Sequence, residues 1–250
     1  MAVSLAVVKR VAARLEAMLV VDEASVAARR LAAFRDAGVP LPRPSPTHVD
    51  TPVGTRYLID AEMQKALSTF VRRSCLSFEE TVRLWRGQHA ADARPNKALR
   101  GHHLAWLPHG YDKQALLLKV IADGVCHNFR EGSTIPRQLS RNHKSANTLE
   151  NALCRSIREG QDAGTYLVVD IDVAERWSVL SYSPFGCVPK ADTDPALEAR
   201  VIHDLSFPVS ASVNDRSDPD ELPQLIYEHI GAIARRIEIS SSALRLRQSS

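Results

Sequence analysis

Two cationic side chains lie in neighbouring strand-like runs: Lys190 ends the run SPFGCVPK, and Arg200 begins the run RVIHDLSFP. Both runs are short, and turn residues separate them, which predicts a hairpin. Lysine is a compact point charge, whereas arginine can hold phosphate oxygens through two parallel N–H groups. A hairpin that carries one of each near its tip could therefore contact phosphate, although most Lys and Arg side chains on hairpins are simply solvated.

The second predicted strand also carries a histidine and an aspartate. Alternation along a strand places Arg200 and Asp204 on one face and His203 on the other. We expect His203 and Asp204 to hold the strand and the following turn in place, in preference to a catalytic role.

Acidic residues suggest two further sites, and neither is favoured. Asp170 and Asp172 in VVDIDV would project from the same face of a strand predicted over 166–173, but a strand edge or a loop-facing pair is a better interpretation than a metal pair. The second set of acidic residues is Asp215, Asp218, Asp220 and Glu221. A solvated turn is the better interpretation for it, because Pro219 lies within it and the acids lack a regular ligand spacing.

Histidine and cysteine patterns do not complete a zinc site or a hydrolase site. The candidates are His102, His103, His109, Cys126, His127 and His143, and no pair among them is matched by a second pair at finger-like distance. A Cys/His hydrolase is compatible with the composition, but no G-x-S-x-G motif is present. We expect no bound metal and no catalytic residue in this chain. The four cysteines lie far apart and are expected to be free thiols.

The elements that would position these residues change in character along the chain. Apolar residues at helical spacing predict an amphipathic helix over residues 5–19, with a possible break at Asp22 or Ser25 and a second helical run that ends near Gly38. Four prolines after Val39 predict extended backbone and make 39–56 the best linker candidate.

Capping residues predict the next helices. Asp60 is expected to cap one helix, and Ser77 begins the capping box of another that runs to about residue 86. Residues 87–110 are expected to form a loop. A buried helix is predicted over 111–123, before Gly124, and a further helix over 145–159, closed by Gly160.

Helices come first and short strands come late, which predicts an α+β fold: a helical N-terminal half followed by a small antiparallel sheet or hairpin. The predicted segments are an amphipathic helical segment 1–38, a proline-rich linker 39–56, a helical segment and loop 57–100, a strand-containing region 101–238 and a disordered tail 239–250.

The late strands carry a resemblance to a known family. The run SPFGCVPK at 183–190, followed by RVIHDLSFP at 200–208 and SVND at 212–215, resembles the fingers region of reverse transcriptases of DIRS-like retroelements. NHKSA at 142–146 is similar to the segment that leads into those fingers. The likeness covers roughly residues 105–238 in order.

The resemblance implies a nucleotide-contacting hairpin in which Lys190 and Arg200 are the phosphate contacts. In the full family, carboxylates of the palm hold two Mg²⁺ ions after the fingers. The stretch after Asp215 shows neither the first catalytic aspartate motif nor the Tyr-x-Asp-Asp motif. We therefore expect a truncated reverse-transcriptase-like protein that is inactive alone and binds no cofactor by itself.

The alternative is a non-enzymatic helical interaction or nucleic-acid-binding module of a retroelement polyprotein, which self-associates through its N-terminal helices. Expected partners are a nucleotide and an RNA or DNA template, held weakly, because a formal charge of +3 gives no strong whole-molecule field. Charges interrupt the first apolar run, so we expect an intracellular protein of the cytoplasm or nucleus that is neither secreted nor bound to a membrane.

Overall fold

The computed structural model describes four long stretches of the chain and several single residues. They are 5–88, 113–125, 128–132 and 139–218, with residues 94, 99, 101, 137, 220, 231 and 235. Within 5–22 the side chains of Lys9 and Ala13 are described. Contacts divide the chain into a main unit, Met1–Cys126 with Glu131–Arg216, and a second unit, His127–Arg130 with Ser217–Ser250.

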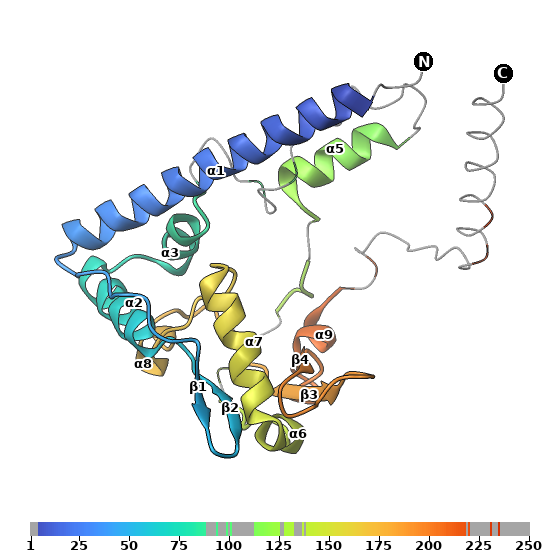
Figure 1. Cartoon of the computed structure of the whole chain (residues 1–250). Coiled ribbons are helices and arrows are strands. Elements are labelled where there is room, and N and C mark those ends of the chain that lie inside the picture. Colours follow the sequence, from blue (N-terminus) through green and yellow to red (C-terminus); the bar gives the residue numbers. More distant parts are fainter. Residues whose placement is uncertain are drawn as a thin grey trace. The chain divides into compact units, whose positions relative to one another are not determined.

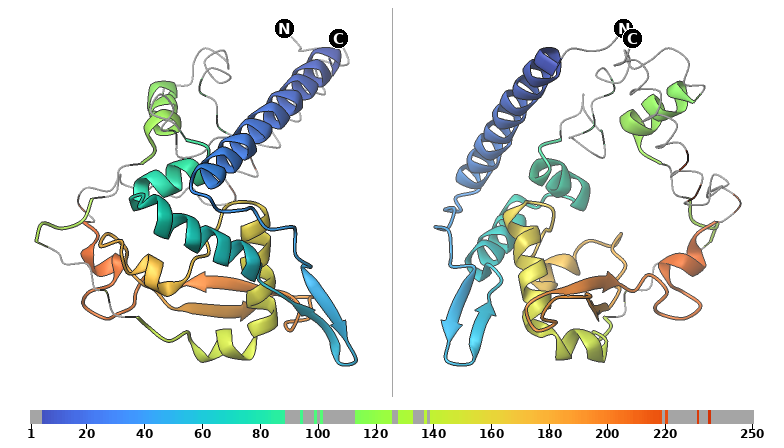
Figure 2. Two further views of the ribbon diagram at one scale, coloured as in Figure 1. Left: turned by 90° about the vertical axis from the view of Figure 1, so that its left-hand side faces the viewer. Right: turned by 45° about the vertical axis from the view of Figure 1, so that its right-hand side comes forward.

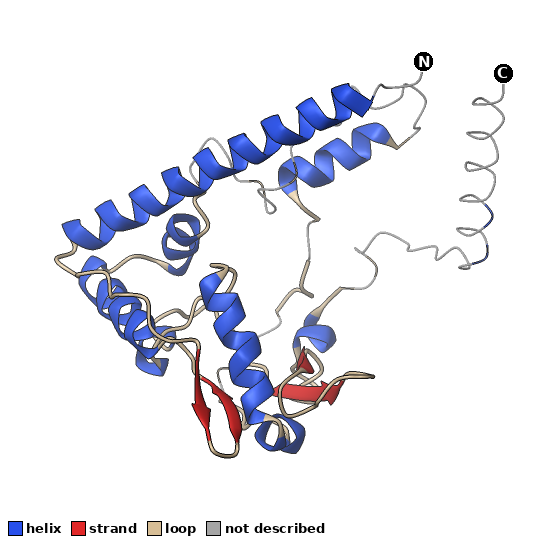
Figure 3. Ribbon diagram, viewed as in Figure 1, coloured by secondary structure: helices blue, strands red, loops and turns tan. Residues whose placement is uncertain are grey.

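The described elements of the main unit are helices and two small sheets (Figures 1 and 3). The helices are α1 (Leu5–Asp36), α2 (Ala61–Ser74), α3 (Phe78–Trp85), α5 (Gln114–Asp123), α6 (Lys144–Thr148), α7 (Glu150–Asp162), α8 (Ile171–Ala174) and α9 (Val213–Arg216). The strands are β1 (His48–Thr51), β2 (Gly54–Tyr57), β3 (Phe185–Pro189) and β4 (Ala199–His203). Each sheet is an antiparallel pair, β1 with β2 and β3 with β4. This combination agrees with the predicted α+β class.

The N-terminal helix is longer than the sequence predicted. The break expected at Asp22 or Ser25 is wrong, because α1 runs without interruption to Asp36. Its sequence contains no proline or glycine, and single Asp or Ser residues cost a helix interior little. The chain leaves the helix at Gly38, whose φ of 67° is unfavourable for other residues.

The predicted linker contains a hairpin that the sequence did not predict. Residues 39–47 belong to no helix or strand, and β1 and β2 follow at once and are joined by the two residues before Gly54. Val39 is buried, and the carbonyl groups of Ser45 and Pro46 accept hydrogen bonds from Arg158 on α7. The segment therefore packs on the main unit.

The two predicted caps are confirmed. The Asp60 carboxylate accepts a hydrogen bond from the backbone N–H of Met63 at 2.9 Å, which starts α2. Ser77 and Glu80 form a reciprocal capping box at the start of α3, and α3 ends at Trp85, close to the predicted boundary. These caps satisfy backbone N–H groups that have no partner within their own helices.

The helix predicted over 111–123 exists from Gln114 and ends before Gly124, but it is not buried as expected. Leu116 and Leu117 are exposed, whereas Ile121 is buried. The apolar run was long enough for a helix, but local sequence alone did not determine what would cover it.

Gly160 does not end a helix, contrary to the prediction. The predicted helix is divided into α6 and α7, and Gly160 lies inside α7. A Cβ atom at Gly160 would lie 2.4 Å from Cδ2 of Tyr166, so glycine permits a close approach of that ring. Gly164, with a φ of 66°, follows the true end of the helix.

The strand predicted over 166–173 is also wrong. Residues 165–170 belong to no helix or strand, and Ile171–Ala174 form α8. The backbone N–H of Asp170 donates to the hydroxyl group of Ser68 on α2 at 2.8 Å, in place of a ladder bond. Leu167 and Val169 still pack on the core at alternate positions. Alternation thus predicted burial correctly but not pairing.

Two hydrophobic clusters hold the main unit together. The larger one joins the end of α1, α2, α3 and α8, and its buried residues are Phe34, Val39, Leu67, Phe70, Val71, Trp85, Val173 and Trp177. The smaller one lies between α6, α7 and the β3–β4 hairpin, and its buried residues are Ala146, Ala152, Leu153, Cys187 and Ala199. Figure 2 gives two more views of α6 and α7 beside this hairpin. The small cluster positions the candidate site.

None of the described helices combines the length and apolar character needed to cross a bilayer.

Candidate functional site

The candidate site is the outward face of the β3–β4 hairpin. Phe185 pairs with His203, and the register continues to Pro189 opposite Ala199. Residues directly opposite each other in an antiparallel pair share a face. Cys187 and Ala199 are buried against α6 and α7, so the inner face is fixed, and the alternate residues form the outer face.

Lys190 and Arg200, the two predicted phosphate contacts, belong to this one hairpin. Arg200 lies opposite Val188 on the outer face. Lys190 comes directly after β3, two residues beyond Val188, and alternation gives it the same face. Diagonal neighbours of this kind are separated by roughly 7–8 Å between Cα atoms. The register therefore places the two cations on one face of one hairpin.

The two cations differ in their surroundings. Lys190 forms an ion pair with Glu198, and its side chain is 40% exposed. Arg200 is exposed, and its side chain has no hydrogen bond or ion pair within the described part of the chain. Arg200 consequently presents a full set of guanidinium donors to solvent.

Glu198 and Arg155 extend the site beyond the predicted residues. Glu198 Oε2 lies 3.8 Å from Arg155 Nη1 on α7. Hydrogen bonding with Lys190 is the main reason why the pKa of Glu198 is lowered, and the charge of Arg155 contributes. Arg155 also binds Glu159 at 2.9 Å, which raises the pKa of Arg155. Its guanidinium lies 5.3 Å from the centre of the Tyr57 ring.

A simple pattern would have revealed Glu198, because it precedes Arg200 by two residues and so shares its face. No comparable sequence pattern pointed to Asn151. Its side chain accepts a hydrogen bond from Tyr57 N and donates to the carbonyl groups of Thr55 and Ala196. Asn151 therefore fixes the loop before Glu198 to β2, a contact between segments distant in the sequence.

The segment NHKSA lies along β3, and this explains how the hairpin is anchored. Asn142 Oδ1 accepts from Phe185 N at 3.0 Å, and His143 N donates to Phe185 O at 2.9 Å. Ser145 Oγ accepts from Cys187 N at 3.2 Å. These bonds satisfy polar backbone groups of β3 that β4 does not reach.

His203 and Asp204 contact segments next to the end of β4. The His203 ring lies 4.8 Å from the Phe185 ring, centre to centre, in an edge-on arrangement. Asp204 Oδ2 lies 2.9 Å from Nε2 of His143, and its Oδ1 accepts from Ser206 N. Both residues thus link the end of β4 to neighbouring segments.

The SVND motif forms part of the same support. Ser212 and Asp215 cap α9 reciprocally, with Asp215 N donating to Ser212 Oγ at 3.0 Å and Ser212 Oγ donating to Asp215 at 2.7 Å. Asn214 donates from its side chain to Ser206 Oγ at 2.9 Å. The motif residues after Arg200 therefore hold one another in place.

Asp170 and Asp172 do not suit a metal ion, because both carboxylates bind the same arginine. Arg72 Nη2 lies 2.8 Å from Asp170 and 2.6 Å from Asp172, and Gln64 donates to the other oxygen of Asp170. This pairing lowers the pKa of both carboxyl groups. Among the residues that the structure describes, no three His, Cys, Asp or Glu side chains gather as metal ligands.

The Arg72 ion pairs predict a specific dependence of stability on pH. The two carboxyl groups have a lower pKa in the folded chain than in the unfolded chain, where it is about 3.9. Their ion pairs with Arg72 therefore stabilise the fold fully above that pH, and this stabilisation is lost as the pH falls through the folded pKa. We expect Arg72→Gln to be less stable than the wild type at pH 6, and the difference to shrink at pH 3. Urea unfolding at both pH values measures it, with Arg83→Gln as the exposed control. A difference independent of pH would contradict the prediction.

The remaining cysteine and histidine candidates are either unsuited to catalysis or lie outside the described residues. Cys187 is buried, and burial raises the pKa of its thiol, which opposes a nucleophilic thiolate. His102, His103, His109, Cys126 and His127 lie outside the described residues, as do most of the predicted loop 87–110 and the tail 239–250.

Comparisons with family models, with curated proteins and with solved structures found no match for this chain.

Proposed function

We propose that the β3–β4 hairpin binds the triphosphate of a nucleotide, as the fingers of a reverse transcriptase of DIRS-like retroelements would. One observation supports this above the others: Lys190 and Arg200 share the outer face of one hairpin whose inner face is buried. A buried inner face limits the directions in which the outer side chains can point. Both cations can therefore reach a ligand on the outer face of the hairpin.

The proposal concerns binding and not chain extension. In this sequence neither palm motif is present, and extension needs two metal ions held by carboxylates. An RNA or DNA template is a second, weaker ligand, which the same exposed cations would contact through its phosphates. Robust extension of an RNA-templated primer by the full chain would contradict this limit.

Removal of either cation is expected to weaken nucleotide binding. Titration calorimetry of the full chain with Mg²⁺–dATP measures it, and we expect Arg200→Ala to weaken binding about ten-fold and Lys190→Ala about five-fold. Arginine has the larger effect because it offers two parallel donors and is not already paired, whereas Lys190 shares its charge with Glu198.

The matched control is Lys65→Ala, which removes one positive charge from an exposed position on α2. We expect it to change dATP affinity less than about two-fold, since an exposed charge distant from the ligand is screened by salt. An equal loss in Lys65→Ala and Lys190→Ala would indicate a general effect of charge. Unchanged binding in both hairpin variants would exclude the phosphate role.

The alternative function is a non-enzymatic module that self-associates through α1. Its support is the apolar spacing over 5–19. Most side chains of that stretch lie outside the described residues. The described contacts of α1 come from its last turns, where Arg29 donates to Gly87 O and Phe34 stacks on Phe70. The nucleotide-binding proposal is therefore the better supported of the two.

A further inference from the structure

The ion pair between Glu198 and Lys190 places an anion inside the proposed phosphate site. The Glu198 carboxylate lies on the face that carries Arg200, and Oε1 accepts from Lys190 Nζ. A nucleotide phosphate at Lys190 would compete for the same ammonium group. Two anions at one ammonium group repel each other, so the carboxylate of Glu198 weakens the contact between a phosphate and Lys190.

Glu198 has an alternative partner close by. Its second oxygen already lies 3.8 Å from Arg155 Nη1. Arg155 binds Glu159 through Nε and the carbonyl group of Leu197 through Nη1, so its five N–H donors are not exhausted by these bonds. A rotation of the Glu198 side chain would exchange a Lys190 hydrogen bond for an Arg155 hydrogen bond.

The exchange requires little rearrangement of the fold. The side chains of Lys190, Glu198 and Arg155 are 40%, 37% and 31% exposed, so water can solvate their charged groups during the movement. Exposed ion pairs contribute little to stability. The loop that carries Glu198 is held by Asn151, which donates to Ala196 O, so the backbone can stay in place.

We propose that Glu198 is a built-in competitor of the phosphate ligand, which must leave Lys190 for Arg155 before a triphosphate can contact Lys190 and Arg200 together. This inference rests on the proposed function and adds its regulation. Glu198 sets the affinity of the hairpin: it excludes ligands with a single weak negative charge and yields to a triphosphate, whose charge is several times larger.

Neutralisation of Glu198 is the direct test. The full chain, as wild type and as Glu198→Gln, is titrated by calorimetry with inorganic triphosphate and separately with Mg²⁺–dATP at one ionic strength. We expect Glu198→Gln to bind both probes about five-fold more tightly, because a like charge next to the ligand has been removed. Glu198→Ala should change affinity in the same direction, which excludes an effect of the new amide group.

The matched control is Glu159→Gln. It removes the same charge from the same arginine, since Glu159 binds Arg155 at 2.9 Å, but no contact joins Glu159 to Lys190 in the described part of the chain. We expect it to change affinity less than about two-fold. Equal tightening in Glu159→Gln and Glu198→Gln would overturn the competitor role, because overall charge would then explain both.

The outcomes separate the two proposals. If Lys190→Ala and Arg200→Ala weaken binding but Glu198→Gln does not tighten it, the hairpin binds phosphate and the competitor role is wrong. If neither cation variant weakens binding, the proposed function is wrong and the competitor role fails with it. In a Lys190→Ala background, Glu198→Gln should lose most of its effect, because the competed group is gone.

Discussion

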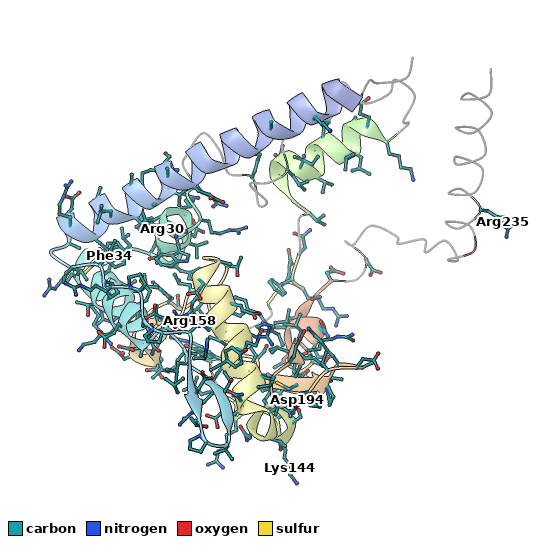
Figure 4. All side chains as sticks on the ribbon, viewed as in Figure 1. Arg30, Phe34, Lys144, Arg158, Asp194 and Arg235 are labelled. Carbon is teal, nitrogen blue, oxygen red and sulfur yellow. The ribbon has the colours of Figure 1, made fainter. Side chains whose placement is uncertain are left out.

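Replacement of Arg158 by alanine is expected to lower the free energy of unfolding by about 3 kcal/mol. The side chain of Arg158 is 5% exposed and projects from α7 toward the segment before β1 (Figure 4). It binds Asp162 at 2.8 Å, Ser45 O at 2.7 Å and Pro46 O at 2.9 Å. Alanine would leave these acceptors without their donor and would remove the tie between α7 and the segment before β1, although Asn151 would still bind β2.

Urea unfolding followed by circular dichroism measures the effect, with Arg83→Ala as the matched control. Arg83 also pairs with an acid four residues away on its own helix, but both side chains are exposed, and we expect a change within about 0.5 kcal/mol. Arg158→Lys should recover part of the loss, because an ammonium group keeps the charge but not the fork of donors. Similar losses in Arg158→Ala and Arg83→Ala would contradict the buried clamp.

Replacement of Phe34 by alanine is expected to lower the free energy of unfolding by about 4 kcal/mol. Phe34 is fully buried near the end of α1, and its ring stacks on Phe70 of α2 with the centres 4.5 Å apart and the planes 4° from parallel. Alanine would lose this contact and leave a cavity in the larger cluster. The last turns of α1 would then lose their main attachment to α2.

Leu31→Ala is the control for Phe34→Ala, because it removes an apolar side chain from the same helix at a position that is 53% exposed. We expect a change below about 1 kcal/mol, since most of that side chain already contacts water. The same urea experiment measures both variants. A loss below about 1 kcal/mol for Phe34→Ala would show that this contact does not hold α1 in place.

Phe34 and Arg158, the residues of the two stability predictions, lie in different kinds of sequence pattern. Phe34 is an apolar residue in the second predicted helical run, which ends near Gly38. Arg158 belonged to a charged run on α7, and nothing local distinguished it from the half-exposed Arg155 one turn earlier. Its burial depends on carbonyl groups more than a hundred residues away.

Local signals were correct where a few neighbouring residues decide the outcome. Asp60 and Ser77 cap their helices because side chain and backbone N–H lie within one turn. The strands around Lys190 and Arg200 formed because β-branched runs and turn residues specify a hairpin locally. Alternation along β4 separates Arg200 from His203, and the shared face of Lys190 and Arg200 follows from the register of β3 with β4.

Local signals were wrong where a distant contact decides. Gly160 suggested a helix end, but the ring of Tyr166 needs the space that a side chain would fill. Residues 166–173 alternate like a strand, but Ser68 on α2 takes the hydrogen bond that a partner strand would have received. The β1–β2 hairpin was missed because prolines dominate the segment before it.

By itself, the sequence determined the helix caps and the β3–β4 hairpin, since these depend on period and on neighbours along the chain. The register of β3 with β4 then placed Lys190 and Arg200 on one face. Only the tertiary structure decided that Glu198 holds Lys190 near Arg155 and that Arg72 binds both Asp170 and Asp172. The physical reason is distance along the chain: periodicity gives the face on which a charge lies, but only packing selects its partner.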